Sequence, residues 1–105
     1  MPNEHLPARK EIRIPMKMFV NLFSPDNPSF ELAPTIDISC HGARVLTKRS
    51  WLPNQQLSVR SIRGTLNSRA RVIYCEPSTD NSFVVGIEIY SPSGDWSARE
   101  VTKLA

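Results

Sequence analysis

Two arginines near the start of the chain are spaced so that both could contact one anionic ligand. Arg9 and Arg13 lie four residues apart in the stretch RKEIR, where a proline-containing N-terminal segment meets the first strand-like run. A guanidinium group donates several hydrogen bonds in one plane, which suits a phosphate or the O6 and N7 edge of guanine. Surface arginines are common, so the spacing alone is more typical of an exposed basic pair beside a strand.

A second group of polar residues lies in the stretch TIDISCHGARV, residues 35–45. Asp37 could accept hydrogen bonds from the N1 and N2 hydrogens of guanine. Ser39 follows two residues later, so both side chains should point to the same face of an extended strand. We expect Gly42 to let the chain turn sharply, in a backbone conformation that is costly for other residues. An Asx or serine turn that simply joins two strands is the alternative.

Short strands must position these residues. Apolar residues occupy every second position from Ile12 to Leu22, which predicts a half-buried strand. Pro15 indicates that this strand lies at an edge or starts after the proline. Further strands are predicted over residues 30–38, with an interruption or delay at Pro34, and over residues 43–47, 57–62, 69–76 and 82–91. A hairpin turn is expected near Gly64.

The strand pattern favours an all-β barrel or sandwich, because short strands alternate with turn signals about every ten residues. One short helix is predicted from about Asp95 to Lys103, where Trp96 and Val101 could pack on the sheet. We expect residues 1–7 to form a flexible tail. Residues 8–105 should form a single domain, since the chain has 105 residues and can bury one modest core.

The composition excludes several classes of protein. No apolar run approaches the roughly 20 residues that cross a membrane, and no secretory signal is visible, so we expect a cytoplasmic protein. Cys40 and Cys75 are too few for a disulfide framework and are expected to be small buried residues. Together with His5 and His41 they match no metal-ligand spacing, so no metal or other cofactor is predicted.

The charge distribution is uneven although the net charge is only +3. No acidic residue occurs between Asp37 and Glu76. That span carries seven basic residues: Arg44, Lys48, Arg49, Arg60, Arg63, Arg69 and Arg71. A solvated basic face is the simpler interpretation, and a positive field that attracts a small anion is the alternative. The mild net charge argues against tight binding to long nucleic acids.

The order of the two polar groups resembles the RxxxR and [D/N]xSxxG motifs of the PilZ domain family. The stretch between Arg13 and Asp37 is long enough for one strand, a turn and a returning strand. The ending VVGIEIYSP resembles the glycine-containing closing strand of that family. The resemblance covers roughly residues 8–96, almost the whole chain.

The resemblance implies a six-stranded antiparallel β-barrel of split-barrel type that binds the bacterial second messenger cyclic di-GMP. It assigns Arg9 and Arg13 to a mobile N-terminal loop that closes over guanine and phosphate. It places Asp37, Ser39 and Gly42 on the barrel surface that receives the ligand. Secondary candidates for ligand contact are Lys10, Arg44 and Arg71. Ala8 stands where some members have another basic residue, which leaves open whether one or two cyclic dinucleotides bind.

An enzyme is not predicted. Cys40 and His41 are neighbours on a strand, where they would point to opposite faces and could not share a proton. The resemblance implies instead a receptor that presents a surface to a protein partner in motility, exopolysaccharide or adhesion control. The alternatives are a degenerate PilZ-like or other small β-barrel that binds only protein, or a single-stranded nucleic-acid binder. The last would need exposed aromatic residues on one sheet face, and aromatic residues are scattered in this sequence.

Overall fold

The computed structural model describes residues 12–93 of the chain. The predicted N-terminal tail and the predicted helix near the C-terminus both lie outside the described residues. The described part contains seven strands: β1 Ile14–Pro15, β2 Phe19–Ser24, β3 Asn27–Ser39, β4 Gly42–Thr47, β5 Gln56–Ser61, β6 Asn67–Pro77 and β7 Phe83–Ser93.

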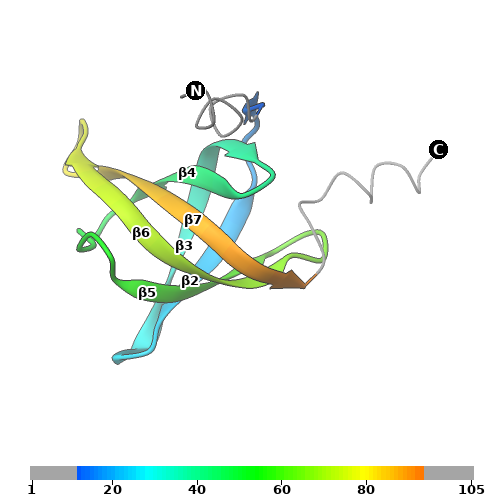
Figure 1. Ribbon diagram of the computed structural model, residues 1–105. Helices are drawn as coiled ribbons and strands as arrows, with labels where there is room; N and C mark the ends of the chain where they lie inside the picture. Colours follow the sequence, from blue (N-terminus) through cyan, green and yellow to red (C-terminus); the bar gives the residue numbers. More distant parts are fainter. Residues whose placement is uncertain (1–11, 94–105) are drawn as a thin grey trace, which may run out of the picture.

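Six of these strands close into an antiparallel barrel (Figure 1). The hydrogen-bonded order is β3-β2-β5-β6-β7-β4, and a further pairing between β3 and β4 completes the circle. The two-residue strand β1 pairs with β3 alone and extends the sheet beside β2. Closure leaves few unpaired backbone groups at sheet edges. The prediction of a six-stranded antiparallel β-barrel is therefore confirmed.

Alternating apolar residues fill the interior of the barrel. In β4 the side chains of Ala43, Val45 and Thr47 point inward and are all buried. In β7 the same alternation buries Val85, Ile87 and Ile89. Burial of each valine or isoleucine side chain contributes about 1.5–3 kcal/mol to the stability of the folded state. The barrel interior therefore provides most of the stabilisation of the fold.

The first predicted strand is interrupted. Thr35 on β3 explains the break, because its Oγ1 accepts a hydrogen bond from the Met18 amide at 3.0 Å and donates one to the Met16 carbonyl at 2.6 Å. The Thr35 side chain thus bonds the backbone in the gap between β1 and β2, where regular pairing with β3 is interrupted. The residues before the break do not join the core: Ile12 and Ile14 are 75% and 48% exposed. The alternation of apolar residues from Ile12 to Leu22 gives no sign of this break.

Pro34 does not interrupt its strand, contrary to the prediction. The amide of Thr35 donates to the Met18 carbonyl on the β2 side. The nitrogen of Pro34 therefore faces the other side of β3, where registered pairing with β4 begins only at Thr35. A proline is tolerated at a position where no ladder hydrogen bond is required.

The two cysteines behave differently from one another. Cys75 is half-buried and packs against the core, and its Sγ accepts a hydrogen bond from the Trp51 amide at 3.5 Å. Cys40 is exposed in the turn between β3 and β4, so the expectation that it is buried is wrong. Its position in the two-residue turn places it beyond the barrel interior. Both thiols are free.

Residues 12–93 contain no helix that is long and apolar enough to span a membrane.

Candidate functional site

A β-bulge turns Asp37 toward the outside of the barrel. Thr35 pairs with Val45 and Asp37 pairs with Arg44, so Ile36 is an extra residue on β3. A bulge shifts the alternation of side chains by one position. Ile36 is consequently 36% exposed, while the next isoleucine along β3 is buried in the core. Asp37 and the arginine opposite it share the outer face.

Two arginines from different parts of the chain hold the Asp37 carboxylate. Arg13, which directly precedes β1, donates from Nη1 to Oδ1 at 2.9 Å. Arg44 on β4 donates from Nε at 2.9 Å and from Nη2 at 2.6 Å, both to Oδ2. The Asp37 side chain is 10% exposed, whereas those of Arg13 and Arg44 are 47% and 41% exposed. The structure thus joins a residue of each predicted motif in one polar cluster.

The electrostatics of this cluster favour an ionised carboxylate. The hydrogen bonds from Arg44 hold the pKa of Asp37 below its ordinary value of 3.8, and the positive charges of Arg44 and Arg13 add to this effect. Partial burial raises the pKa and opposes them without cancelling them. Asp37 is therefore an acceptor at neutral pH, able to bind the N–H groups of a ligand.

The lowered pKa predicts how stability depends on pH. The stabilisation from ionised Asp37 is complete above 3.8, its ordinary value, and is lost as the pH falls through the lower folded-state value. The Asp37→Asn variant lacks this dependence. Its free energy of unfolding should fall less steeply than that of the wild type between about pH 4 and pH 2. Urea unfolding followed by circular dichroism measures both slopes.

Equal slopes for the Asp37→Asn variant and the wild type would show that the arginines do not favour the ionised carboxylate.

Ser39 and Gly42 lie at the ends of the hairpin that follows Asp37. Ser39 is buried and donates from Oγ to the Gly42 carbonyl at 3.4 Å. Its register opposite Gly42 places it on the same outer face as Asp37, as predicted. The exposed turn between them is formed by Cys40 and His41.

The role expected of Gly42 needs correction. Gly42 is not among the described residues with a positive φ, so the turn does not require its conformational freedom. Instead, a Cβ atom at this position would lie 2.5 Å from the carbonyl oxygen of Ile87 on β7. The glycine is needed because two backbones approach closely, as they do at some strand glycines.

Sequence reasoning missed two residues that support the cluster. Tyr74 lies opposite Gly86, after a bulge in β6 that shifts its side chain to the outer face. A Cβ atom on Gly86 would overlap the Tyr74 ring, so the ring covers β7 at this point. Asp37, and to a smaller extent Tyr74, raise the pKa of the Arg44 guanidinium above its ordinary value. The glycine inside an otherwise β-branched run was the available signal, because it marks a close approach.

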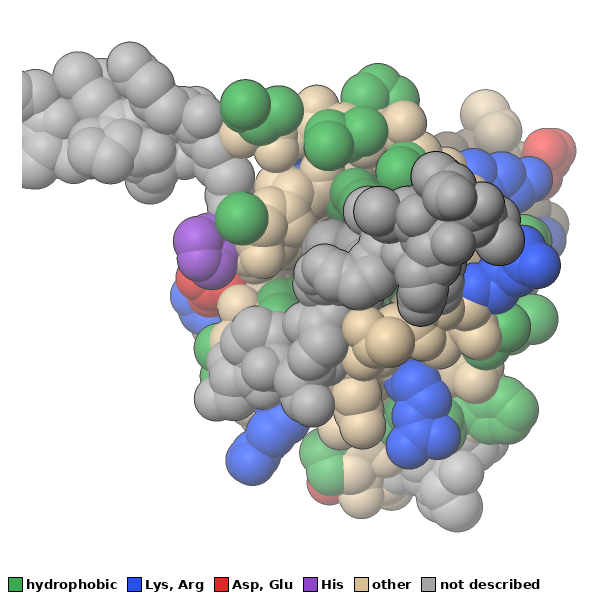
Figure 2. Space-filling model, turned by 90° about the vertical axis from the view of Figure 1, so that its right-hand side faces the viewer, with side chains coloured by type: hydrophobic (Ala, Val, Ile, Leu, Met, Phe, Trp, Pro, Cys, Tyr) green, Lys and Arg blue, Asp and Glu red, His purple; other side chains and the backbone are tan. Residues whose placement is uncertain are grey.

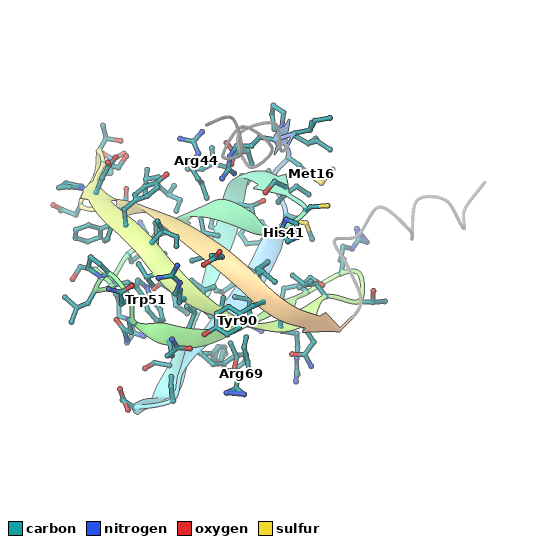
Figure 3. All side chains as sticks on the ribbon, in the orientation of Figure 1. Met16, His41, Arg44, Trp51, Arg69 and Tyr90 are labelled. Carbon is teal, nitrogen blue, oxygen red and sulfur yellow. The ribbon has the colours of Figure 1, made fainter. Side chains whose placement is uncertain are left out.

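The secondary candidates separate into three groups. Arg44 belongs to the cluster, and in Figure 3 it lies at the top of the view, near β4. Arg71 lies two strands from Gly42 on the same face, roughly 10 Å away laterally. Its guanidinium bonds Glu88 and Asn54, and no contact joins it to Asp37 among the described interactions. Lys10 lies outside the described residues, as does Arg9, which was predicted as a main ligand residue.

The other features of the described surface do not suggest catalysis. A cavity of about 340 Å³ is lined by six residues, none of them a predicted ligand residue: Ser24, Asp26, Arg49, Ser50, Trp51 and Gln55. Within residues 12–93, no group of three or more His, Cys, Asp or Glu side chains could hold a metal ion. Basic side chains occupy several separate places on the face shown in Figure 2.

A small closed barrel that carries a carboxylate and two arginines on its outer face has the features of a ligand-binding domain. The family comparison identifies which one: the PilZ domain model matches residues 7–99. The chain belongs to the PilZ domain family, whose domains are non-enzymatic receptors. No curated protein matches the chain closely enough to add a named relative.

Proposed function

We propose that this protein binds cyclic di-GMP on the outer face formed by β3 and β4. The observation that carries the proposal is the contact between Arg13 and Asp37. These residues belong to the two motifs of the PilZ resemblance, and the fold brings them within hydrogen-bond distance. Membership of the PilZ family supports the same ligand.

Binding would exchange one ion pair for two ligand contacts. The N1 and N2 hydrogens of guanine can replace the Arg13 guanidinium at Asp37 Oδ1. Arg13 would then be available for a phosphate or for the guanine O6 and N7 edge. Arg44 would stay on Oδ2 and hold the carboxylate in position. Because Arg44 keeps its hydrogen bonds to Oδ2, the carboxylate stays paired when Arg13, whose side chain is 47% exposed, moves to the ligand.

The remaining contacts complete the proposed site. Ser39 lies on the same face as Asp37 and can offer its hydroxyl, and Arg9 would approach from the N-terminal segment. Gly42 would act indirectly, by allowing the hairpin to lie against β7. We further propose that residues 8–105 act as one domain in the cytoplasm. A protein partner in motility, exopolysaccharide or adhesion control would receive the signal.

Isothermal titration calorimetry of the purified chain with cyclic di-GMP tests the proposal. We expect micromolar or tighter binding, with no comparable heat from GTP or from a short single-stranded DNA. The stoichiometry would also show whether one or two cyclic dinucleotides bind beside Ala8. Absence of binding by a folded protein would refute the proposal and favour a PilZ-like module that binds only protein.

A further inference from the structure

Aromatic residues that are scattered in the sequence gather on one outer face of the barrel. Phe19 and Phe23 on β2 and Phe30 on β3 all point outward, since they alternate with buried neighbours. The rings of Phe23 and Phe30 lie 5.6 Å apart between centroids. The outward aliphatic residues beside them are Leu32 and Pro34 on β3 and Ile62 just after β5.

The exposure of these side chains is large for a barrel of this size. Phe19 is 43% exposed, Phe30 52%, Ile62 51% and Leu32 55%. The register shows that they are contiguous: Phe19 pairs with Pro34, and its carbonyl accepts a hydrogen bond from the Ile62 amide. We call Phe19, Phe23, Phe30, Leu32, Pro34 and Ile62 the apolar strip. A contiguous exposed apolar patch of this kind typically marks an interaction site.

A row of positive charge borders the apolar strip. Arg60 on β5 pairs with Asn21, the outward residue of β2 between the two phenylalanines. Arg69 on β6 pairs with Ser58 and continues the row. At the end of the strip, the Lys17 ammonium lies 5.7 Å from the centroid of the Phe19 ring. In Figure 3, Arg69 lies at the bottom of the view beside Tyr90, far from Arg44.

The positive charge beside the apolar strip favours a negatively charged partner. No acidic residue points outward within the described stretches that form the face, residues 19–23, 30–34, 58–62 and 67–69. Their one acidic residue, Glu31, pairs with buried Leu22 and therefore points inward. In a twofold dimer the same surface of each copy would form the interface. Arg60 and Arg69 of one copy would then face the arginines of the other, and these like charges would repel. An acidic partner gains favourable pairing instead.

The spacing of the two rows suggests the shape of the partner. Leu32 and Arg60 lie on either side of β2, so they are roughly 10 Å apart. An α-helix has a diameter of about 10–12 Å with its side chains. A helix lying along β2 would reach both rows. We infer that this face binds an acidic amphipathic helix of another protein, with its apolar side on the apolar strip and its carboxylates on Arg60 and Arg69.

The distribution of residue types disfavours a single-stranded nucleic acid. Such a ligand would require aromatic rings interleaved with basic residues along one track. Here the three aromatic rings lie on β2 and β3, whereas Arg60 and Arg69 lie on β5 and β6. Half of the apolar strip is aliphatic or proline. This face is also distinct from the Asp37 cluster, so the inference does not depend on binding of cyclic di-GMP.

A pair of synthetic helices tests the inference. Each peptide has about 18 residues, long enough to form a helix, with leucine along one side. One peptide carries glutamate and the other lysine on the flanking positions. Fluorescence anisotropy with the full chain should show binding of the glutamate peptide only. Leu32→Asp and Arg60→Glu should each weaken this binding about tenfold or more.

Matched controls lie outside the face. Leu52→Asp changes an exposed leucine in the β4–β5 connection, and Lys48→Glu reverses an exposed charge after β4. Both variants should bind the glutamate peptide as the wild type does. Circular dichroism should show unchanged folding for all four variants, because each substitution is at an exposed position.

Several results would overturn the inference. These are failure to bind the glutamate peptide, equal binding of both peptides, or unchanged binding by the Leu32→Asp and Arg60→Glu variants. Tighter binding of a peptide with the sequence of residues 94–105 would assign the face to the chain's own C-terminal segment. Preference for an oligothymidine or for phosphatidylglycerol vesicles would assign it to nucleic acid or membrane. A dimer in sedimentation that Leu32→Asp dissociates would assign it to a second copy.

Discussion

The Arg13→Ala variant is expected to lose at least tenfold in affinity for cyclic di-GMP while remaining folded. Arg13 lies outside the core with its side chain 47% exposed, and its hydrogen bond to Asp37 is the contact that the ligand would take over. Removal of a charge-assisted contact costs about 1.5–3 kcal/mol, which corresponds to tenfold or more in affinity. Calorimetric titration measures this loss.

Two further variants separate the role of Arg13 from that of general charge. Arg13→Lys keeps the charge without the planar fork, so it should restore only part of the affinity. Arg63→Ala removes one exposed arginine from the β5–β6 turn and should bind almost normally. Full affinity of the Arg13→Ala protein would mean that the ligand, if bound, occupies another site.

The Gly42→Ala variant is expected to lose about 1–3 kcal/mol of unfolding free energy. The added Cβ atom would lie 2.5 Å from the Ile87 carbonyl oxygen, which belongs to the backbone of a paired strand and cannot rotate away. Strands β4 and β7 must separate locally, close to Ser39. Chemical denaturation monitored by Trp51 fluorescence measures the change.

Cys40→Ala provides the control for this hairpin, because Cys40 is exposed in the adjacent turn. Its effect should stay within about 0.5 kcal/mol, as for most surface substitutions. A Gly42→Ala protein as stable as the wild type would show that β4 and β7 can move apart without loss.

The strand pattern was enough to predict the barrel. It was not enough to predict where individual strands are interrupted. The alternating residues of β4, β5 and β7 have the period of half-buried strands, and their burial follows it. The run from Ile12 to Leu22 does not form one strand, and β2 begins after the proline, as the alternative prediction had it. The break arises because the Thr35 side chain from another strand bonds the backbone at Met16 and Met18. Such a contact between distant residues leaves no local periodic signal.

In the candidate site, too, the residue types could be predicted from the sequence, whereas their contacts with distant residues could not. The types and order of Arg13, Asp37 and Ser39 are enough to suggest a guanine ligand, since their functional groups match its edges. Arg44 was predicted only as a secondary ligand contact, and neither its hydrogen bonds to Asp37 nor the support from Tyr74 was foreseen. That support depends on β7, which pairs with β6 on one side and with β4 on the other. It thereby brings Tyr74 close to Arg44, a residue distant along the chain.

The sequence by itself determined the class of fold and the chemical groups of the candidate site, because hydrophobic period and residue type are local properties. Only the tertiary structure decided which side of the barrel each group faces. The extra residues Ile36 and Ile73 shift the alternation by one position, so that Asp37 and Tyr74 point outward. A bulge forms where two strands pair out of step, and that depends on both strands together.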